Sequence, residues 1–108
     1  MVFQVEEYAV ELNELVQPLV WRMQRRDKAL ADQLSRAVAS VALNIAEGNG
    51  SDPGNKRARF FTALGSARET RTALRLGVAR RYFFIEDAGN SLRLLDRILA
   101  ILWSLTHR

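Results

Sequence analysis

The sequence of 108 residues contains no cysteine and a single histidine, His107. Without cysteine, the chain can form neither disulfides nor thiolate metal sites. A lone histidine also argues against a histidine-ligated metal or a Ser-His-Asp triad within one chain. We therefore expect no metal, no cofactor and no enzymatic activity.

Long apolar runs are also missing. No stretch approaches the roughly 18 consecutive apolar residues that a membrane-spanning helix needs. Residues 1–7 lack the basic start and apolar stretch of a signal peptide. From these features we expect a cytoplasmic protein with no membrane partner.

Proline and glycine are scarce, with two and six residues, and most of them separate strongly periodic segments. Within those segments, apolar residues recur at steps of three and four, which is typical of helices packed on one face. The predicted helices cover about residues 4–24, 28–47, 55–80 and 87–106. Similar lengths and short connections predict an all-α, antiparallel up-down-up-down four-helix bundle, a single domain over residues 1–108.

Local signals support these boundaries. Asp27 is a plausible N-cap for the second helix, and Gly48 suits the left-handed position that ends it. Asp52 followed by Pro53, or alternatively Asn55, is placed to cap the third helix.

Two residues that weaken helices lie inside the predicted ones. Pro18 removes one backbone hydrogen bond, so we expect a kink near residues 14–18 or two shorter helices. Gly65 costs roughly 1 kcal/mol relative to alanine. Its usual benefit is close helix approach, here against a stripe of small residues in the second helix: Ala39, Ala42 and Ala46.

Charge is unevenly distributed along the chain. Residues 1–54 hold 5 Lys/Arg and 8 Asp/Glu, a balance of −3, and residues 55–108 hold 11 and 4, a balance of +7. These sum to the net charge of +4. Such asymmetry indicates an anionic partner for the second half, or contact between oppositely charged parts of two subunits.

The third helix carries a stripe of cationic residues. Arg57 and Arg68 are eleven residues apart, about three turns, so they point the same way, and Arg71 and Arg75 continue that face. Lys56 and Arg59 add charge at its start. This stripe is a candidate for binding the phosphates of RNA or DNA.

An alternative reading pairs these arginines with an acidic protein partner or with acidic residues of the first helix: Glu6, Glu7, Glu11 and Glu14. No aromatic residue is clearly interleaved with the stripe, so sequence-specific reading of bases is not supported.

Asn44 and Glu47 share one face of the second helix. Since no second catalytic group accompanies Glu47, we interpret them as a buried polar pair that fixes helix register, with Glu47 paired to an arginine such as Arg36 or Arg68.

Exposed aromatic side chains are expected at the ends of the helices: Trp21, Trp103 and the turn of residues 82–85. Because interfaces are rich in such residues, we expect self-association, with ordinary core packing as the alternative.

The segment from Ser40 to Gly48, Ser-Val-Ala-Leu-Asn-Ile-Ala-Glu-Gly, resembles the "S-I/V-x-x-N-I-A-E-G" signature of the 23S rRNA-intervening-sequence protein family. Residues 32–37 resemble its "Q-L-R-R-A" segment. Residues 60–69 resemble its "F…A-L-G-S-A-x-E" segment, including Gly65 and ending at Glu69. Order and spacing agree over nearly the whole chain.

This resemblance implies a four-helix bundle that assembles into a ring-shaped homopentamer, as in relatives. A related branch, the accessory variability determinant proteins of diversity-generating retroelements, binds nucleic acid and a reverse transcriptase through basic surfaces. The resemblance therefore implies RNA or DNA as a partner. The motif residues Asn44, Glu47, Gly48, Gly65 and Glu69 are expected to have structural roles.

The chain departs from the family pattern in its loops. Members carry Gly-Tyr after the third helix, where this chain has Arg81-Tyr82. An arginine at a left-handed position carries mild strain, unless the turn differs. Members also carry Phe-Pro and Tyr-Gly in the region that corresponds to residues 21–30 here, so the first helix is expected to run on or turn differently.

Overall fold

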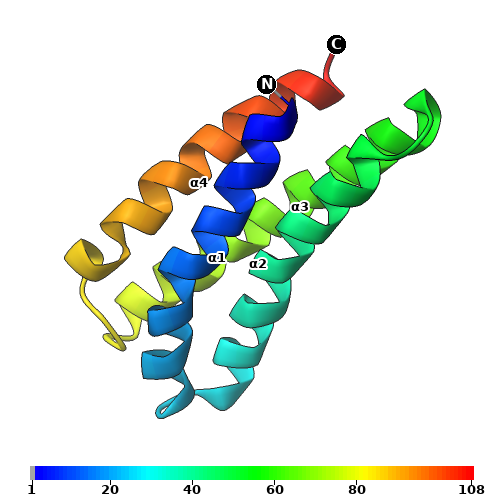
Figure 1. The fold of residues 1–108 in the computed structure, drawn as a ribbon. Coiled ribbons are helices and arrows are strands. Elements are labelled where there is room, and N and C mark those ends of the chain that lie inside the picture. Colours follow the sequence, from blue (N-terminus) through cyan, green and yellow to red (C-terminus); the bar gives the residue numbers. More distant parts are fainter. Residues whose placement is uncertain (1) are drawn as a thin grey trace.

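The computed structural model describes residues 2–108, which form four helices joined by short links. The helices are α1 (Val2–Gln24), α2 (Lys28–Asn49), α3 (Pro53–Ala79) and α4 (Ile85–Thr106). Successive helices run in opposite directions, and both termini lie at the end of the bundle where α2 turns into α3 (Figure 1). The predicted all-α, up-down-up-down bundle is confirmed, and every helix boundary lies within two residues of its prediction.

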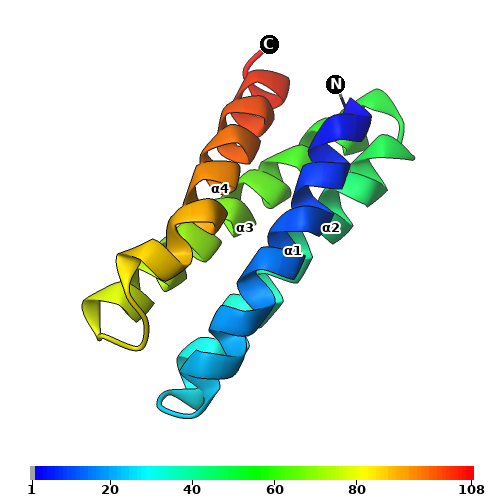
Figure 2. The same cartoon turned by 60° about the vertical axis from the view of Figure 1, so that its left-hand side comes forward.

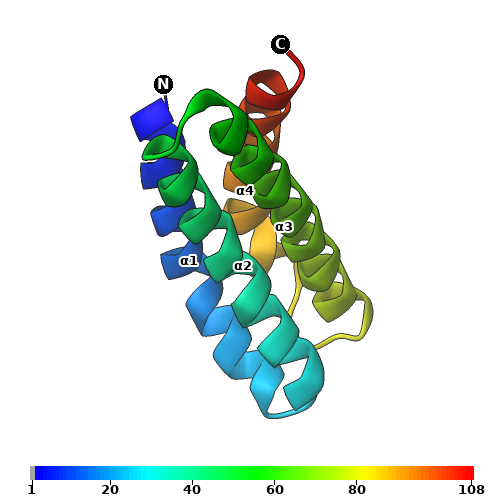
Figure 3. The ribbon, with the colours of Figure 1, turned by 90° about the vertical axis from the view of Figure 1, so that its right-hand side faces the viewer.

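Each helix packs mainly against two others. α1 packs against α2 and α4, and α3 packs against the same two helices, so α1 and α3 occupy opposite corners. Figures 2 and 3 show this arrangement from two further sides. The bundle measures 42 × 22 × 20 Å. Within residues 2–108, no helix combines the length and the apolar character needed to cross a membrane.

An apolar core runs along the bundle axis, built from the stripes that the periodicity predicts. Burying one side chain of leucine size contributes about 1.5–3 kcal/mol, so this column is the main source of stability. Its largest members, all without solvent contact, come from the four helices: Leu12, Met23, Leu34, Ile45, Leu74, Leu95, Ile98 and Leu102.

Two aspartates cap helices as predicted. The Asp27 carboxylate accepts a hydrogen bond from the backbone N–H of Leu30 at 3.0 Å, at the start of α2. At the start of α3, Asp52 accepts from the N–H of Asn55 at 3.1 Å and Pro53 occupies the first helical position. The alternative in which Asn55 caps α3 is therefore excluded.

Pro18 lies inside α1, which continues through it as one helix to Gln24. The expected division into two pieces is wrong. The reason lies in the packing: Pro18 is exposed, whereas Val16 and Leu19 on either side of it are buried. Core contacts on both sides thus hold the helix together despite the lost hydrogen bond.

The structure corrects both glycine predictions. Gly48 is not left-handed and lies inside α2, which ends one residue later at Asn49. A Cβ at Gly48 would lie only 2.6 Å from Cε1 of the buried Phe60 ring, so glycine admits Phe60 of α3 against α2. Gly65 is exposed and a Cβ there would meet nothing within 4 Å, so its expected role in close helix approach is wrong.

The turn after α3 has the expected left-handed residue. Arg81 has φ 63°, and no other non-glycine residue among those described has a positive φ. The Arg81 N–H donates to the Val78 carbonyl at 3.0 Å, and the Tyr82 N–H donates to the Gly77 carbonyl at 2.9 Å. This pattern is a Schellman motif, in which the left-handed position strongly favours glycine.

Candidate nucleic-acid interface

Arginines lie along the side of α3 that adjoins α4. Arg57, Arg68 and Arg75 share this face, because intervals of eleven and eighteen residues correspond to about three and five turns. Arg71 lies near the same line. We call these four residues the α4-side edge of α3, because Arg57 and Arg71 contact α4 and the helical spacing places Arg68 and Arg75 in line with them.

The four arginines of this edge are not equally engaged. The Arg57 guanidinium donates two hydrogen bonds to the Thr106 carbonyl at the end of α4, at 3.2 and 2.9 Å. Arg71 lies 3.6 Å from the Asp96 carboxylate of α4, and both side chains are largely exposed. Arg68 and Arg75 are exposed, and neither forms an ion pair with any side chain that the structure describes. Their charge is available to an external anion.

The opposite side of α3, which adjoins α2, also carries arginines, but they are paired. Arg59 lies 2.9 Å from the Glu47 carboxylate of α2. Arg80 lies 2.8 Å from the Asp27 carboxylate that caps α2. We call Arg59, Ser66 and Arg80 the α2-side edge of α3. The sequence grouped Arg59 with the stripe, whereas the structure places it on this other edge.

Asp27 links the two turns at the far end of the bundle from the termini. Besides the Leu30 N–H, its carboxylate accepts hydrogen bonds from the Tyr82 hydroxyl at 2.9 Å and from Arg80. These hydrogen bonds, the one from the Leu30 backbone above all, lower the pKa of Asp27 below its usual value.

Lys56 lies at the first turn of α3, half-buried, and lines a hollow of about 300 Å³ at the terminal end of the bundle. Arg57 and Arg108 line the same hollow. Three cationic side chains therefore gather where α3 begins and α4 ends.

The acidic residues of α1 do not neutralise the arginines of α3. Among the described residues, no ion pair involves Glu6, Glu7, Glu11 or Glu14. Glu6 instead accepts a hydrogen bond from the Asn49 side chain at 2.8 Å. The reason is that α1 and α3 occupy opposite corners of the bundle. The predicted pairing of the arginines of α3 with the glutamates of α1 within one chain is therefore wrong.

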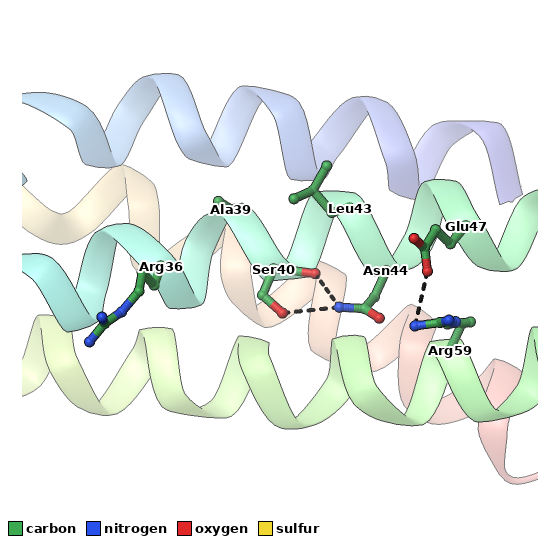
Figure 4. Close-up of a pocket in the computed structure, with 7 residues that line it drawn as sticks. All are labelled: Arg36, Ala39, Ser40, Leu43, Asn44, Glu47 and Arg59. Atoms are coloured by element: carbon green, nitrogen blue, oxygen red, sulfur yellow. Dashed lines mark hydrogen bonds and ion pairs between the residues drawn. The ribbon is translucent and has the colours of Figure 1, made fainter.

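Polar side chains join α2 to α3 along an open groove of about 420 Å³ (Figure 4). Asn44 donates to the carbonyl and the hydroxyl oxygen of Ser40, at 2.9 and 3.0 Å. The Ser40 hydroxyl lies 2.8 Å from that of Ser66 on α3. The groove thus contains a short hydrogen-bonded chain that connects the two helices.

Asn44 and Glu47 only partly match their prediction. Asn44 is half-buried, and both of its hydrogen bonds go to Ser40 within α2, so the Ser40 hydroxyl, and not Asn44 itself, makes the link to α3. Glu47 is exposed, and its partner is Arg59 and neither Arg36 nor Arg68. The expectation of a buried pair therefore fails for Glu47.

A family model described as 23S rRNA-intervening sequence protein matches residues 3–104. The chain belongs to this family. A comparison with curated proteins finds no match. Among solved structures, the chain is similar to a protein of unknown function from the S23 ribosomal protein family of Bacteroides thetaiotaomicron. The TM-score is 0.88 at 20% identity, over 96% of this chain and 99% of that one, which supports the shared fold.

The signature segments of the 23S rRNA-intervening sequence protein family meet between α2 and α3. Gly48 faces the Phe60 ring, and Ser40 meets Ser66. Near the other end, Gln33 makes a long hydrogen bond of 3.5 Å to Glu69. In this chain, the signature therefore describes how two helices pack, and it includes none of the arginines of the α4-side edge except Arg68.

The aromatic residues divide between core and surface. In the turn before α4, Phe83 is buried and Phe84 is exposed, and Ile85, the first residue of α4, is also exposed. Trp21 and Trp103 are also exposed. Sequence reasoning missed that Phe61 lies beside the basic face, with the Arg57 guanidinium 5.5 Å from its ring centre. The four-residue interval between Phe61 and Arg57 was the available signal.

Proposed function

We propose that this protein is a non-catalytic, homo-oligomeric accessory or scaffold protein that binds RNA or DNA through the α4-side edge of α3. The observation that carries the proposal is the open charge of Arg68 and Arg75 on the face where Arg57 and Arg71 also lie. Cations that replace the counterions of a phosphate backbone supply binding energy without reading sequence. We place this activity in the cytoplasm.

A non-catalytic role agrees with the chemistry of the α2–α3 groove. Glu47, the carboxylate of this groove, is exposed and paired with Arg59. Asn44 and Ser40 are hydrogen-bonded to each other. These groups are engaged in holding α2 against α3, which supports a structural role for the groove.

Self-association is supported by apolar side chains that one chain leaves exposed. Leu43 is 66% exposed on α2, and beside it in the helix Ala39 and Ala46 also contact solvent. Other large exposed apolar residues lie on α1 and where the α3–α4 turn enters α4: Val10, Trp21, Phe84 and Ile85. A ring of five subunits is the assembly that the family resemblance implies.

A second candidate function is a protein-interaction scaffold with no nucleic-acid role. It is favoured by the acidic side chains of α1, of which Glu7, Glu11 and Glu14 are exposed. They face away from α3 within one chain, so the arginines of a neighbouring copy are the complement they lack. In that case the α4-side edge is a subunit contact. In the other form of this candidate, the arginines of α3 pair with an acidic protein partner.

The test is fluorescence-anisotropy titration of a structured RNA and a duplex DNA across a range of salt concentrations, with the assembly mass measured by light scattering. Replacing Arg68, Arg71 and Arg75 together with alanine should weaken binding and lower the slope of log affinity against log salt by about two to three. The bundle should stay folded, because all three side chains are exposed.

Arg59→Ala is the matched control, since it removes one arginine of α3 from the other edge. It should leave the salt slope nearly unchanged. If the triple variant binds as well as the parent, the proposed face is wrong. If the parent fails to bind at low salt and its assembly dissociates at high salt, the scaffold with charged subunit contacts replaces the proposal.

A further inference from the structure

Three aromatic rings form an ordered cluster where α4 ends beside the start of α3. The rings of Trp103 and His107 are stacked, with centroids 4.2 Å apart and an angle of 7° between planes. Phe61 of α3 meets the His107 ring edge-on at 5.7 Å. Trp103 is 52% exposed and Phe61 42% exposed, so the cluster presents aromatic surface to solvent. We call these three rings the aromatic platform.

Hydrogen bonds hold the aromatic platform in place. The Nδ1 atom of His107 lies 2.9 Å from the Trp103 carbonyl oxygen. Arg57 fixes the end of α4 through its two hydrogen bonds to Thr106, and it also lies over the Phe61 ring. Because these side chains are ordered before any ligand arrives, binding on them loses little conformational entropy.

Cationic side chains adjoin the platform. Residues 53–68 and 97–108, the segments that contribute the three rings, contain six Lys/Arg, and Asp52, Glu69 and Asp96 border them. Of the six, Arg59 is paired with Glu47 and Arg97 donates to the Tyr8 hydroxyl. The adjoining hollow of about 300 Å³ is lined by Lys56, Arg57 and Arg108 together with apolar side chains. Exposed aromatic surface beside these three cationic side chains fits a ligand that is both anionic and aromatic.

Trp21 provides a useful contrast. It is 60% exposed, but no ring that the structure describes stacks on it. The charges near it are also of both signs: the neighbouring Arg22 is paired with Asp87 at 3.2 Å, and Asp27 lies a few residues further along the chain. Exposure of a tryptophan alone therefore does not define this site.

We propose that the ligand of the basic face is single-stranded nucleic acid, with unpaired bases stacking on the aromatic platform. This inference rests on the proposed function and specifies its substrate class. Lys56, Arg57 and Arg108 hold phosphates beside the rings, and the strand continues along α3 to Arg68. In a duplex the base faces are already stacked on one another, so only unpaired bases can use the platform.

Intrinsic tryptophan fluorescence provides the first test. The Trp21→Phe variant retains Trp103 as its single tryptophan, and the Trp103→Phe variant retains Trp21. Both are titrated with a short mixed-sequence single strand, with its duplex, and with an abasic strand that has the same phosphate backbone but no bases. The single strand should quench Trp103 and leave Trp21 unchanged, whereas the duplex and the abasic strand should quench neither.

Affinity provides the second test. Trp103→Ala should weaken single-strand binding about 5- to 150-fold, the range for the loss of one stacked base, and leave duplex binding within about twofold. Trp21→Ala is the matched control and should change neither affinity. Circular dichroism confirms that each variant is folded, which is expected because both side chains are more than half exposed.

The outcomes separate the two proposals. Salt-dependent binding without quenching of Trp103, or with unchanged affinity after Trp103→Ala, overturns the stacking proposal and leaves the basic face intact. Tighter binding of the duplex than of the single strand also overturns it. Failure of the parent to bind any of the three ligands at low salt overturns the proposed function, and the stacking proposal with it.

Discussion

The two edges of α3 carry the same kinds of residue and use them differently. On the α2-side edge, Arg59 and Arg80 are paired with carboxylates, and Ser66 meets a hydroxyl of α2. On the α4-side edge, Arg68 and Arg75 have no acidic partner among the described residues. An arginine thus indicates binding only when the fold leaves its charge unpaired, and the difference predicts that one edge governs stability and the other governs affinity.

The largest expected effect concerns the close contact of α2 with α3. Gly48→Leu places a side chain against the buried Phe60 ring, where even a Cβ would be 2.6 Å from a ring carbon. We expect a loss of about 3 kcal/mol in the free energy of unfolding, the upper part of the usual range for overpacking. Urea unfolding followed by circular dichroism measures it, and the folded fraction should keep its nucleic-acid affinity.

Gly65→Ala is the matched control for that variant. A Cβ at Gly65 meets nothing within 4 Å, so Gly65→Ala should raise the free energy of unfolding by about 1 kcal/mol, because alanine has the better helix propensity. Changes of opposite sign in the free energy of unfolding at the two glycines would confirm that only Gly48 is required for packing. A loss of stability at Gly65 would mean that this surface is covered, as in a subunit contact.

A second pair of variants separates stability from affinity. Asn44→Ala removes the donor to Ser40, which should cost about 1 kcal/mol in the free energy of unfolding and leave nucleic-acid affinity unchanged. Arg68→Ala should lower nucleic-acid affinity and leave the free energy of unfolding unchanged, because this exposed side chain forms no ion pair with the described residues. Paired urea unfolding and anisotropy measurements check both. If Asn44→Ala weakened binding as strongly as Arg68→Ala, the division between the edges would fail.

A third variant removes charge from the turn after α3 without touching either edge. Arg81 occupies the left-handed position of the Schellman motif with φ 63°, where glycine carries no steric penalty. Arg81→Gly should therefore raise the free energy of unfolding by about 0.5–1 kcal/mol, which is measured as a higher Tm. Affinity should change little, since Arg81 lies beyond the proposed face. Arg81→Ala, which keeps the strain while losing the charge, distinguishes the conformational effect from an electrostatic one.

Periodicity and capping chemistry were sufficient to predict most of the fold. The three- and four-residue spacing predicts helices packed on one apolar face, which is where Leu34 and Leu95 are buried, and the cap at Asp27 fixes the start of α2. The departure at Arg81 was also interpretable, because few residues other than glycine adopt a positive φ without strain. These features depend on neighbours along the chain, so sequence alone specifies them.

Sequence reasoning failed where neighbours come from another helix. It assigned close approach to Gly65, whereas Gly48 provides it, and it grouped Arg59 with the stripe, whereas Arg59 pairs with Glu47. Helical spacing gives the direction of a side chain around its own axis but not which helix lies there. The aromatic platform was missed for the same reason, because Phe61 and His107 are brought together only by the packing of α3 on α4.

The smallest expected effect concerns the far end of the α2-side edge, where Asp27 accepts hydrogen bonds from the Leu30 N–H, Tyr82 and Arg80. These interactions lower the pKa of Asp27 in the folded state, whereas in the unfolded chain it stays near about 3.9. Asp27 therefore contributes stability that is fully present above about pH 4 and is lost as pH falls further through the folded-state pKa.

Asp27→Asn should change stability only slightly at pH 7, because asparagine also caps helices and Arg80, which pairs with Asp27, is about half exposed to solvent. The difference between parent and variant should shrink as pH falls below about 4, because the carboxylate of the unfolded parent binds a proton there before that of the folded parent does. Urea unfolding at pH 7, pH 5 and pH 3 measures this convergence. A difference that stayed constant, or grew toward low pH, would show that the pairing of Asp27 with α3 does not stabilise this edge, and the contrast between the two edges would then rest on Arg59 and Ser66 alone.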